Sequence, residues 1–185
     1  MNPSNTWFNA RKAAQVAAYF ALQESGSINV LKLTKLIYIS DRIHMDRYDY
    51  PILNDKLVAM PHGPVNSMTY EFINGDQEDD GWNEFITDRE GHNVGLTNSI
   101  SIDELDELSE AEISTLKEVW ASFGHMEQYT IRDWTHKNCL EWDDPHGSSN
   151  PIPYARVFKF LGKKNAELLE EKINESCSMA EIFSR

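Results

Sequence analysis

Apolar residues recur at helical spacing through most of this 185-residue chain. The first such segment predicts a helix from Ala10 to Glu24, where alanines favour helix formation and larger apolar residues mark a face for the core. A second helix is predicted from Asn29 to Arg47, and apolar residues occupy most of its circumference. Because such a helix must be buried on more than one side, we expect it near the centre of the domain.

Shorter elements follow along the chain. Leu57–Met60 is a short apolar segment that leads into a turn at His62-Gly63-Pro64-Val65. Proline is well suited to the first position of a helix, so the pattern predicts a third helix over Pro64–Ile73. Residues that favour β-structure in Trp82–Asp88 and Asn93–Ile102 predict a small hairpin between these two segments.

The second half of the chain is predicted to be helical again. Ser109 and Glu112 have the spacing of a capping box, which predicts a helix that begins there and ends near Gly124. Further helices are predicted over Thr130–Cys139, Tyr154–Leu161 and Asn165–Glu175, followed by a loosely anchored tail over 177–185. The predicted fold class is mostly α (α+β), a single compact domain over 1–185 of roughly six or seven helices with a small β-hairpin element.

Composition and charge narrow the class of protein. The chain is 41% hydrophobic and 11% aromatic, which is typical of a folded domain. Its net charge of −13 is concentrated between Asp76 and Glu112, where 13 acidic residues stand beside a single basic one, Arg89. An acidic surface repels phosphates, so we expect no nucleic-acid binding through this segment. It is either a solvated surface, the commoner case, or a surface that steers a basic partner.

The sequence also predicts where the protein acts. No apolar run approaches the roughly 20 residues that span a bilayer. The first fifteen residues lack a basic patch followed by a hydrophobic stretch, so we expect no signal peptide. Cys139 and Cys177 form no CxxC pair, which indicates two reduced thiols. We therefore expect a cytoplasmic protein without a membrane partner.

Candidate catalytic and metal-binding residues are few. His136 and Cys139 have a spacing that can hold zinc on one helical turn, but no second ligand pair follows. His62 can be paired with Asp41 or Asp55 as a general base, a combination that almost any histidine allows. No nucleophile elbow, Walker loop or dinucleotide fingerprint occurs. The residues thus give no positive indication of an enzyme, and we expect neither a metal nor a cofactor.

Three other histidines have plainer interpretations. His44 shares a helical face with apolar residues and is predicted to be a hydrogen-bonded core histidine. His92 falls in the predicted turn and His146 in a loop, so both are expected to face solvent.

The second predicted helix has one narrow polar stripe, formed by Lys32, Lys35 and Arg42, with Ile39 in it at helical spacing. The stripe is either a solvated face or a contact surface, where the lysines donate to a partner's carboxylates and Tyr38 adds an amphipathic contact. For Ile39 the commoner case is an ordinary exposed isoleucine, and for Tyr38 it is a tyrosine in the core. A DNA reader would also need a surrounding basic field, which the overall charge does not supply.

Several of these motifs occur together in one known family. The run Lys32-Leu33-x-Lys35-Leu36-x-Tyr38, the later His62-Gly63-Pro64-Val65, and Thr135-His136 with Trp142 downstream resemble the Panacea antitoxin domain. This is the SocA-like family, long carried as a phage-associated protein family. The resemblance extends from the first predicted helix to the one over Tyr154–Leu161.

The resemblance implies a bacterial or prophage antitoxin that neutralises a co-encoded toxin by direct protein contact. Some members of the family resemble adaptors that deliver the toxin to a cytoplasmic protease. Two alternatives stay open, a small metal-dependent hydrolase or nuclease that uses His62 or His136 with nearby acids, and a DNA-binding autorepressor.

The motif residues divide into two predicted groups. The candidate partner-binding residues are Lys32, Lys35, Tyr38, Ile39, Arg42 and His62. The candidate structural residues are Gly63, Pro64 and Val65, which form the predicted turn, and His136 and Trp142, which we expect to hold the last helices together.

Overall fold

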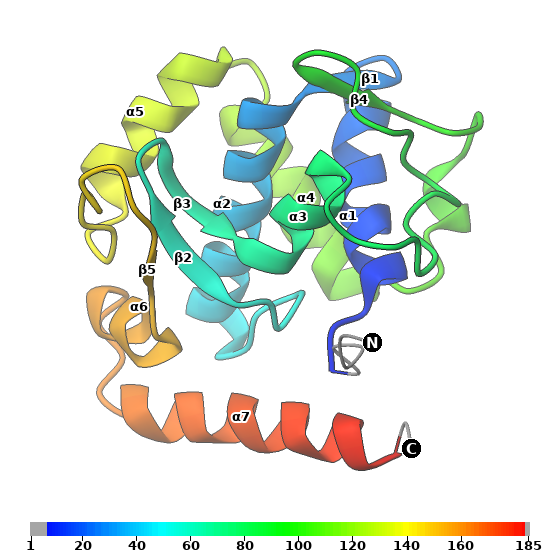
Figure 1. The fold of residues 1–185 in the computed structure, drawn as a ribbon. Helices are drawn as coiled ribbons and strands as arrows, with labels where there is room; N and C mark the ends of the chain where they lie inside the picture. Colours follow the sequence, from blue (N-terminus) through cyan, green and yellow to red (C-terminus); the bar gives the residue numbers. More distant parts are fainter. Residues whose placement is uncertain (1–6, 184–185) are drawn as a thin grey trace.

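The computed structural model describes residues 7–183 (Figure 1). Within that range the chain folds into seven α-helices, one 3₁₀ turn and two small antiparallel sheets, which confirms the predicted mostly α class. The helices are α1 (Ala10–Gln23), α2 (Val30–Tyr48), α3 (Ser67–Asn74), η1 (Ile102–Glu104), α4 (Glu110–Phe123), α5 (Gln128–Asn138), α6 (Tyr154–Phe160) and α7 (Ala166–Phe183). The strands are β1 (Ser27–Asn29), β2 (Leu57–Met60), β3 (Gly63–Asn66), β4 (Asn93–Gly95) and β5 (Asn150–Pro151).

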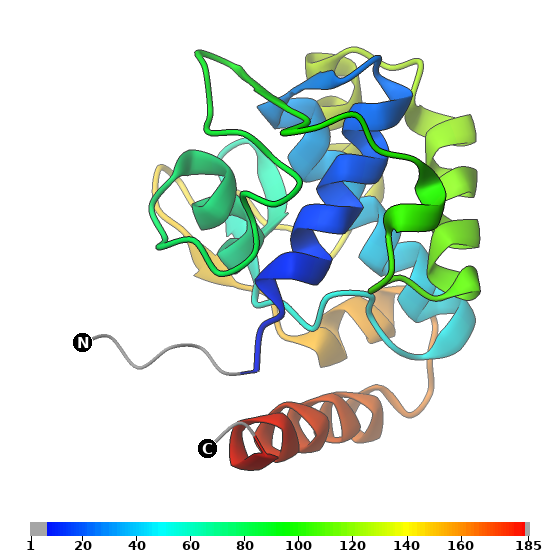
Figure 2. The same ribbon diagram turned by 90° about the vertical axis from the view of Figure 1, so that its right-hand side faces the viewer.

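Helix α2 lies at the centre of the molecule, as its apolar circumference predicted. It packs against α1, α4 and α5 and against the β2–β3 hairpin (Figures 1 and 2). Every side chain from Lys32 to Asp41 is buried. The alanine-rich face of α1 lets that helix approach α2 closely, because small side chains leave room between the two backbones. The main core therefore forms around these two helices and α4.

A second and smaller apolar cluster lies towards the C-terminal end of α2. It joins residues of α6 and α7 with Leu57 and Ala59 of β2 and the buried Cys139. Helix α7 continues to Phe183, past the predicted end at Glu175, so 177–183 of the predicted tail are helical. Residues 184–185 of that tail lie outside the described residues. No helix within 7–183 has the length and apolarity that crossing a membrane requires.

The Gly63-Pro64-Val65 segment is a β-strand, and the prediction that Pro64 starts a helix is wrong. Strand β3 pairs antiparallel with β2, with Ala59 opposite Pro64, and α3 begins only at Ser67. The three-stranded sheet has the order β3-β2-β5, so β3 is an edge strand. A proline is tolerated there because its missing N–H is not needed by a further neighbour.

The hairpin predicted around the 89–92 turn forms only in part. Its two segments meet at isolated bridges, Ile86 to Leu96 and Glu90 to Asn93. The regular partner of β4 is instead β1, the short strand just before α2. The sequence prediction missed β1 because three residues between two helices are too few to show a strand period.

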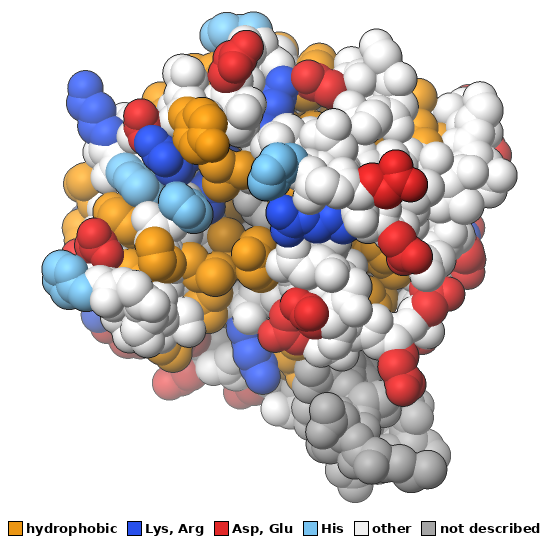
Figure 3. All heavy atoms as spheres, turned by 45° about the horizontal axis from the view of Figure 1, so that its top comes forward, with side chains coloured by type: hydrophobic (Ala, Val, Ile, Leu, Met, Phe, Trp, Pro, Cys, Tyr) orange, Lys and Arg blue, Asp and Glu red, His pale blue; other side chains and the backbone are white. Residues whose placement is uncertain are grey.

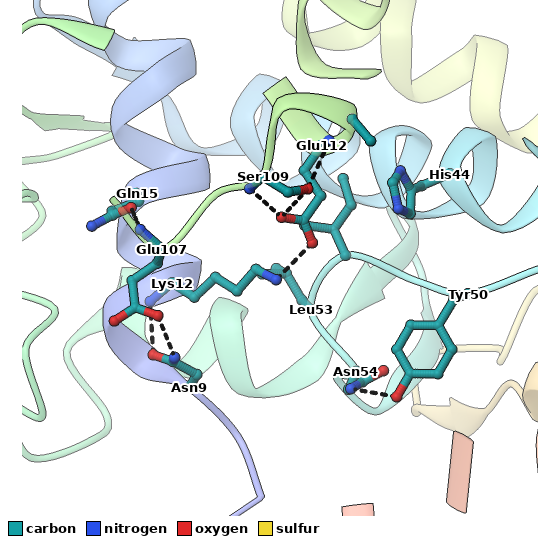
Figure 4. A network of polar contacts seen from close by, with 12 residues as sticks. Asn9, Lys12, Gln15, His44, Tyr50, Leu53, Asn54, Glu107, Ser109 and Glu112 are labelled. Carbon is teal, nitrogen blue, oxygen red and sulfur yellow. Dashed lines mark hydrogen bonds and ion pairs between the residues drawn. The ribbon is translucent and has the colours of Figure 1, made fainter. Parts of the chain in front are cut away.

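The acidic segment is anchored to α1 by charge. Arg11 donates to Glu84, Asp106 and Glu107, and these three carboxylates raise the pKa of its guanidinium. Lys12 forms an ion pair with Glu112, whose other oxygen accepts from the backbone N–H and hydroxyl of Ser109 (Figure 4). The predicted capping box is therefore present, and it is tied to α1 as well as to the start of α4.

Two buried aspartates hold the connections on either side of the hairpin. Asp41 of α2 accepts from the backbone N–H groups of Ile52 and Leu53 and from the Asn66 amide. Asp55 accepts from two backbone N–H groups at the start of α3, which has no side-chain cap of its own. Burial raises the pKa of Asp41 to about 7 and that of Asp55 to about 6, although these donors oppose the rise. Neither carboxylate accepts from His62, so the structure does not form the general-base pairs that the sequence allowed.

A pair of glycine substitutions tests how tightly the hairpin is packed. Gly63 has a φ of +101°, and an added Cβ would lie 2.9 Å from the Thr135 hydroxyl and 3.2 Å from the Lys35 ammonium. Gly75, which caps α3 with a φ of +78°, has open space at that position. We expect Gly75→Ala to lower the free energy of unfolding by about 1 kcal/mol. Gly63→Ala should lower it by about 3 kcal/mol, because overpacking adds to the backbone strain.

Denaturant unfolding of both variants measures the difference. Equal losses for the two substitutions would contradict the close contact between the hairpin and α5.

Candidate functional site

A pocket of about 340 Å³ opens beside the N-terminal half of α2. Its walls come from α2, the tip of the β2–β3 hairpin, α3, the segment before β4 and the first turn of α5. Its charged, imidazole and phenol side chains are Lys35, His62, Tyr70, Arg89, His92 and Tyr129. In the face drawn in Figure 3, basic and histidine side chains gather around hydrophobic ones. No aspartate or glutamate lines this pocket in the described part of the chain, despite the net charge of −13.

Local structure around the start of α2 fixes one wall of the pocket. Asn29 caps the helix, and its side-chain oxygen accepts from the N–H groups of Leu31 and Lys32. The N–H of Val30 donates to the His92 carbonyl, so the loop before β4 is held against the helix terminus. The first N–H groups of α2 are thus already used within the fold.

Arg89 is restrained at the rim of the pocket. Its guanidinium donates to the Gly91 carbonyl at 2.8 Å and to the side-chain oxygen of Asn74. Arg89 is also the single basic residue of the acidic segment 76–112. The fold therefore places the single lysine or arginine of that segment at the pocket that Lys35 also lines.

Lys35 is the most constrained charge of the site. The residue is 0% exposed, and its Nζ donates to the Pro64 carbonyl at 2.9 Å. It forms no ion pair with any residue in 7–183. Burial lowers the pKa of Lys35 to about 7, with Cys139 opposing the shift and Arg132 adding to it. A lysine ammonium has three N–H donors, and the Pro64 carbonyl accepts from one of them.

The predicted polar stripe of α2 is not a surface, and that prediction is wrong. Lys32 is 6% exposed and is held by Glu24 at 2.7 Å and by the Gly124 carbonyl at 2.8 Å. Ile39 is 1% exposed and belongs to the main core. The stripe is covered because α2 is central, and other elements pack over the side of the helix that helical spacing predicted to be polar. The same burial removes the face that a DNA-binding autorepressor would use on this helix.

Tyr38 and Arg42 share one buried partner. The Glu141 carboxylate accepts from the Tyr38 hydroxyl and from Arg42 Nε, both at 2.8 Å. Burial, with Glu141 next, raises the pKa of Tyr38 well above its usual value, so the phenol remains a donor. Sequence reasoning missed Glu141, because it follows α5 in a loop and no periodicity marks it. These contacts give Tyr38 and Arg42 structural partners, while their contact with another protein stays a prediction.

His136 and Trp142 connect α5 and the loop after it to the hairpin. Their rings stack with centroids 4.0 Å apart and planes 3° from parallel. The Trp142 indole N–H donates to the Met60 carbonyl of β2 at 2.9 Å. Burial, with Lys35 next, lowers the pKa of His136, which favours the neutral ring. His136 Nε2 is buried and has no hydrogen-bond partner among residues 7–183.

Three of the other histidines, His44, His92 and His146, are placed as predicted. His44 is buried, with Nδ1 3.0 Å from the Thr115 hydroxyl, and burial lowers its pKa. His92 and His146 are exposed. His62 is exposed at the hairpin tip, where it lines the pocket. Within residues 7–183 no group of three or more histidine, cysteine or acidic side chains is arranged to hold a metal ion.

Of the predicted partner-binding residues, the structure brings Lys35 and His62 together in the pocket. Sequence reasoning missed its other members, Tyr70, Arg89, His92 and Tyr129. The sequence feature that could have indicated Arg89 is its isolation as the single arginine within an acidic segment. The two tyrosines have none, because they lie on different helices that only the tertiary fold brings together.

Replacing Lys35 tests the unfavourable burial of its charge. An unfolded lysine stays protonated up to a pKa near 10.5, whereas the folded Lys35 loses its proton near 7. The burial therefore destabilises the protein fully below pH 7, and the penalty fades between pH 7 and 10.5. We expect Lys35→Met to raise the free energy of unfolding by on the order of 3 kcal/mol at pH 7, and by much less at pH 10.

Denaturant unfolding at both pH values measures this change. Lys32→Met is the control, because it breaks the ion pair with Glu24, and it should lower the free energy of unfolding at pH 7. A Lys35→Met variant that is less stable than the wild type at pH 7 would show that the lysine is stabilising where it lies.

Comparison with known proteins yields one match. The family model described as "Antitoxin SocA-like, Panacea domain" matches residues 33–143, which is more than half of the chain. No curated protein and no solved structure matches the chain. The matched range runs from α2 through the hairpin and α3 to the loop after α5, and it contains Lys35, His62, Arg89 and Glu141.

Proposed function

The chain belongs to the SocA-like Panacea family of antitoxins, and on that premise we propose that it neutralises a co-encoded protein toxin by binding it directly. The observation that carries the proposal is the family match over 33–143. That range includes most of the central helix and most of the residues that line the pocket. The protein would act in the cytoplasm through protein contact, without a catalytic step of its own.

The geometry of the pocket supports a binding role. It combines a buried cation, exposed histidines and aromatic side chains with apolar residues of the hairpin and α2. Tyrosine and arginine side chains are enriched at protein interfaces, and Tyr129 is 58% exposed beside this pocket. The pocket is therefore the part of the molecule to which we assign the toxin.

Neutralisation can follow two routes after binding. In the first the antitoxin covers the working surface of the toxin, and in the second it delivers the toxin to a cytoplasmic protease as an adaptor. The two routes differ in what happens to the toxin. Blocking leaves the toxin level unchanged, whereas delivery shortens its half-life and requires the protease.

Co-expression tests the proposal. The toxin is taken as the product of the neighbouring reading frame and is induced with and without this protein. We expect growth to be restored only when both are present, and the two proteins to co-purify from an inactive-toxin strain. Measuring the toxin half-life after translation is stopped then separates blocking from delivery.

An unrelated acidic protein of similar size, expressed at the same level, is the control for non-specific rescue. Growth that is not restored, or that is restored without any complex between the two proteins, would overturn direct neutralisation.

A further inference from the structure

We propose that Arg89, at the rim of the pocket beside α2, binds a side-chain carboxylate of the toxin. The inference rests on the proposed function and adds to it the contact residue and the chemical group that the partner presents. The contact needs only the exposed guanidinium at the opening, and Lys35 stays a buried part of the wall.

The charge of Arg89 is left without a counter-ion by the fold. It is the one arginine within residues 7–183 that forms no ion pair, and it donates instead to two neutral acceptors, the Gly91 carbonyl and the Asn74 side chain. The segment 76–112 around it nevertheless holds 13 acidic residues. The other described arginines all pair with a carboxylate, namely Arg11, Arg42, Arg47, Arg132 and Arg156.

The guanidinium of Arg89 is both oriented and accessible. Its Nε donates to the Gly91 carbonyl at 2.8 Å, and its Nη1 donates to Asn74 at the end of α3. A guanidinium has more N–H donors than these two contacts use, including both on Nη2. A carboxylate can accept two parallel hydrogen bonds from such a planar group. Because the side chain is exposed and already held, a partner reaches it with little loss of rotamer freedom.

The rest of the pocket lining adds no negative charge. His62 of the hairpin tip and His92 before β4 are exposed and line the same pocket, and no aspartate or glutamate lines it within residues 7–183. Asp88 and Glu90 flank Arg89 in the sequence, yet in the described part of the chain neither pairs with it. Figure 3 shows basic and histidine side chains gathered around hydrophobic ones on this face. A carboxylate at the opening therefore meets no acidic side chain of the pocket.

Tyr129 supplies apolar contact area beside this charge. It is 58% exposed and lines the pocket, and the Arg132 guanidinium lies 5.0 Å from its ring centroid. Arg132 already pairs with Asp133, so it is less available to an anion than Arg89 is. Tyrosine and arginine are enriched where protein interfaces are strongest. The apolar neighbours of an acidic residue on the partner can pack on Tyr129 while its carboxylate pairs with Arg89.

The surrounding charge favours a single carboxylate over a nucleic acid. Asp88, Glu90 and the rest of the segment 76–112 are strongly acidic. A chain of phosphates would be repelled along its length by this segment, whereas one carboxylate on a protein partner contacts only the guanidinium. The pocket volume of about 340 Å³ also suits a side chain and its apolar neighbours.

The start of α2 argues for a side chain over a chain terminus. Terminal carboxylates are captured by clusters of free backbone N–H groups. Here the N–H groups of Val30, Leu31 and Lys32 already donate to the His92 carbonyl and the Asn29 side chain. The group that fits Arg89 is therefore the side chain of an aspartate or glutamate.

Calorimetric titration with an inactive variant of the neighbouring-gene toxin tests the inference. Arg89→Gln should weaken binding about tenfold or more, the scale of one charge-assisted hydrogen-bonded pair. Arg89→Lys keeps the charge but loses the planar fork, so its affinity should lie between those of the wild type and Arg89→Gln. Arg47→Gln is the matched control, because it removes the same charge at the other end of α2, and it should bind within about threefold of the wild type.

His62→Glu tests the sign of the partner group while Arg89 stays intact. This exposed substitution places a carboxylate at the hairpin tip of the same pocket, and it should weaken binding by repulsion. It keeps the test decisive if Arg89→Gln disturbs the loop before β4. Tighter binding by His62→Glu would indicate a cationic partner group and overturn the inference.

A double-mutant cycle identifies the partner group. Each acidic residue of the toxin is replaced by its amide, and one replacement should weaken binding to the wild type without weakening binding to Arg89→Gln further. A toxin extended by two glycines, which moves its terminal carboxylate away, should bind normally. Loss of binding by the glycine-extended toxin alone would assign Arg89 to a chain terminus and overturn the side-chain contact.

The outcomes separate the two proposals. If the wild type does not bind the toxin, direct neutralisation fails and the contact fails with it. If the wild type binds while Arg89→Gln and His62→Glu bind equally well, neutralisation stands and the contact at Arg89 is overturned. Weaker binding by Arg89→Gln that couples to no acidic residue of the toxin would also overturn the contact.

Discussion

The structure depends on one constraint, which is that α2 is buried on every side from Lys32 to Asp41 and yet carries several polar groups there. Each buried polar group must find a partner inside the fold, since an unpaired one costs far more than a hydrogen bond returns. Lys32 reaches Glu24 and the Gly124 carbonyl, Asp41 holds the loop after the helix together with the hairpin, and Glu141 joins Tyr38 to Arg42. These contacts draw α4, the hairpin and the loop after α5 onto the helix, so they place the walls of the site as well as the core.

Among the buried groups of α2, Lys35 meets this requirement least fully. Its neighbours on the helix have partners of opposite charge or several donors, whereas Lys35 has one neutral carbonyl. The fold keeps an ammonium in a place where its charge is disfavoured, as the lowered pKa shows. Groups held at such a cost often mark functional sites. The same residue thus weakens the free protein.

The uneven charge of the protein gains a structural explanation. Arg11 and Lys12 of α1 form ion pairs with four carboxylates of the acidic segment 76–112. These ion pairs hold a long stretch with little regular secondary structure against α1. Docking that stretch also carries Arg89 and His92 to the start of α2. A basic pocket is in this way built into a protein whose net charge is strongly negative.

The sequence by itself determined most of the helices, the central place of α2, the capping box at Ser109 and the family, because these follow from local periodicity and short motifs. It did not determine the strand at Gly63, where the edge of a sheet tolerates Pro64, or the pairing of β4 with β1. It also marked Lys32 and Ile39 as a face open to a partner, although both are buried. Only the tertiary structure decided which polar residues are covered and which line a pocket. Helical spacing shows that residues share a face, but what packs on that face is set by segments far away in the chain.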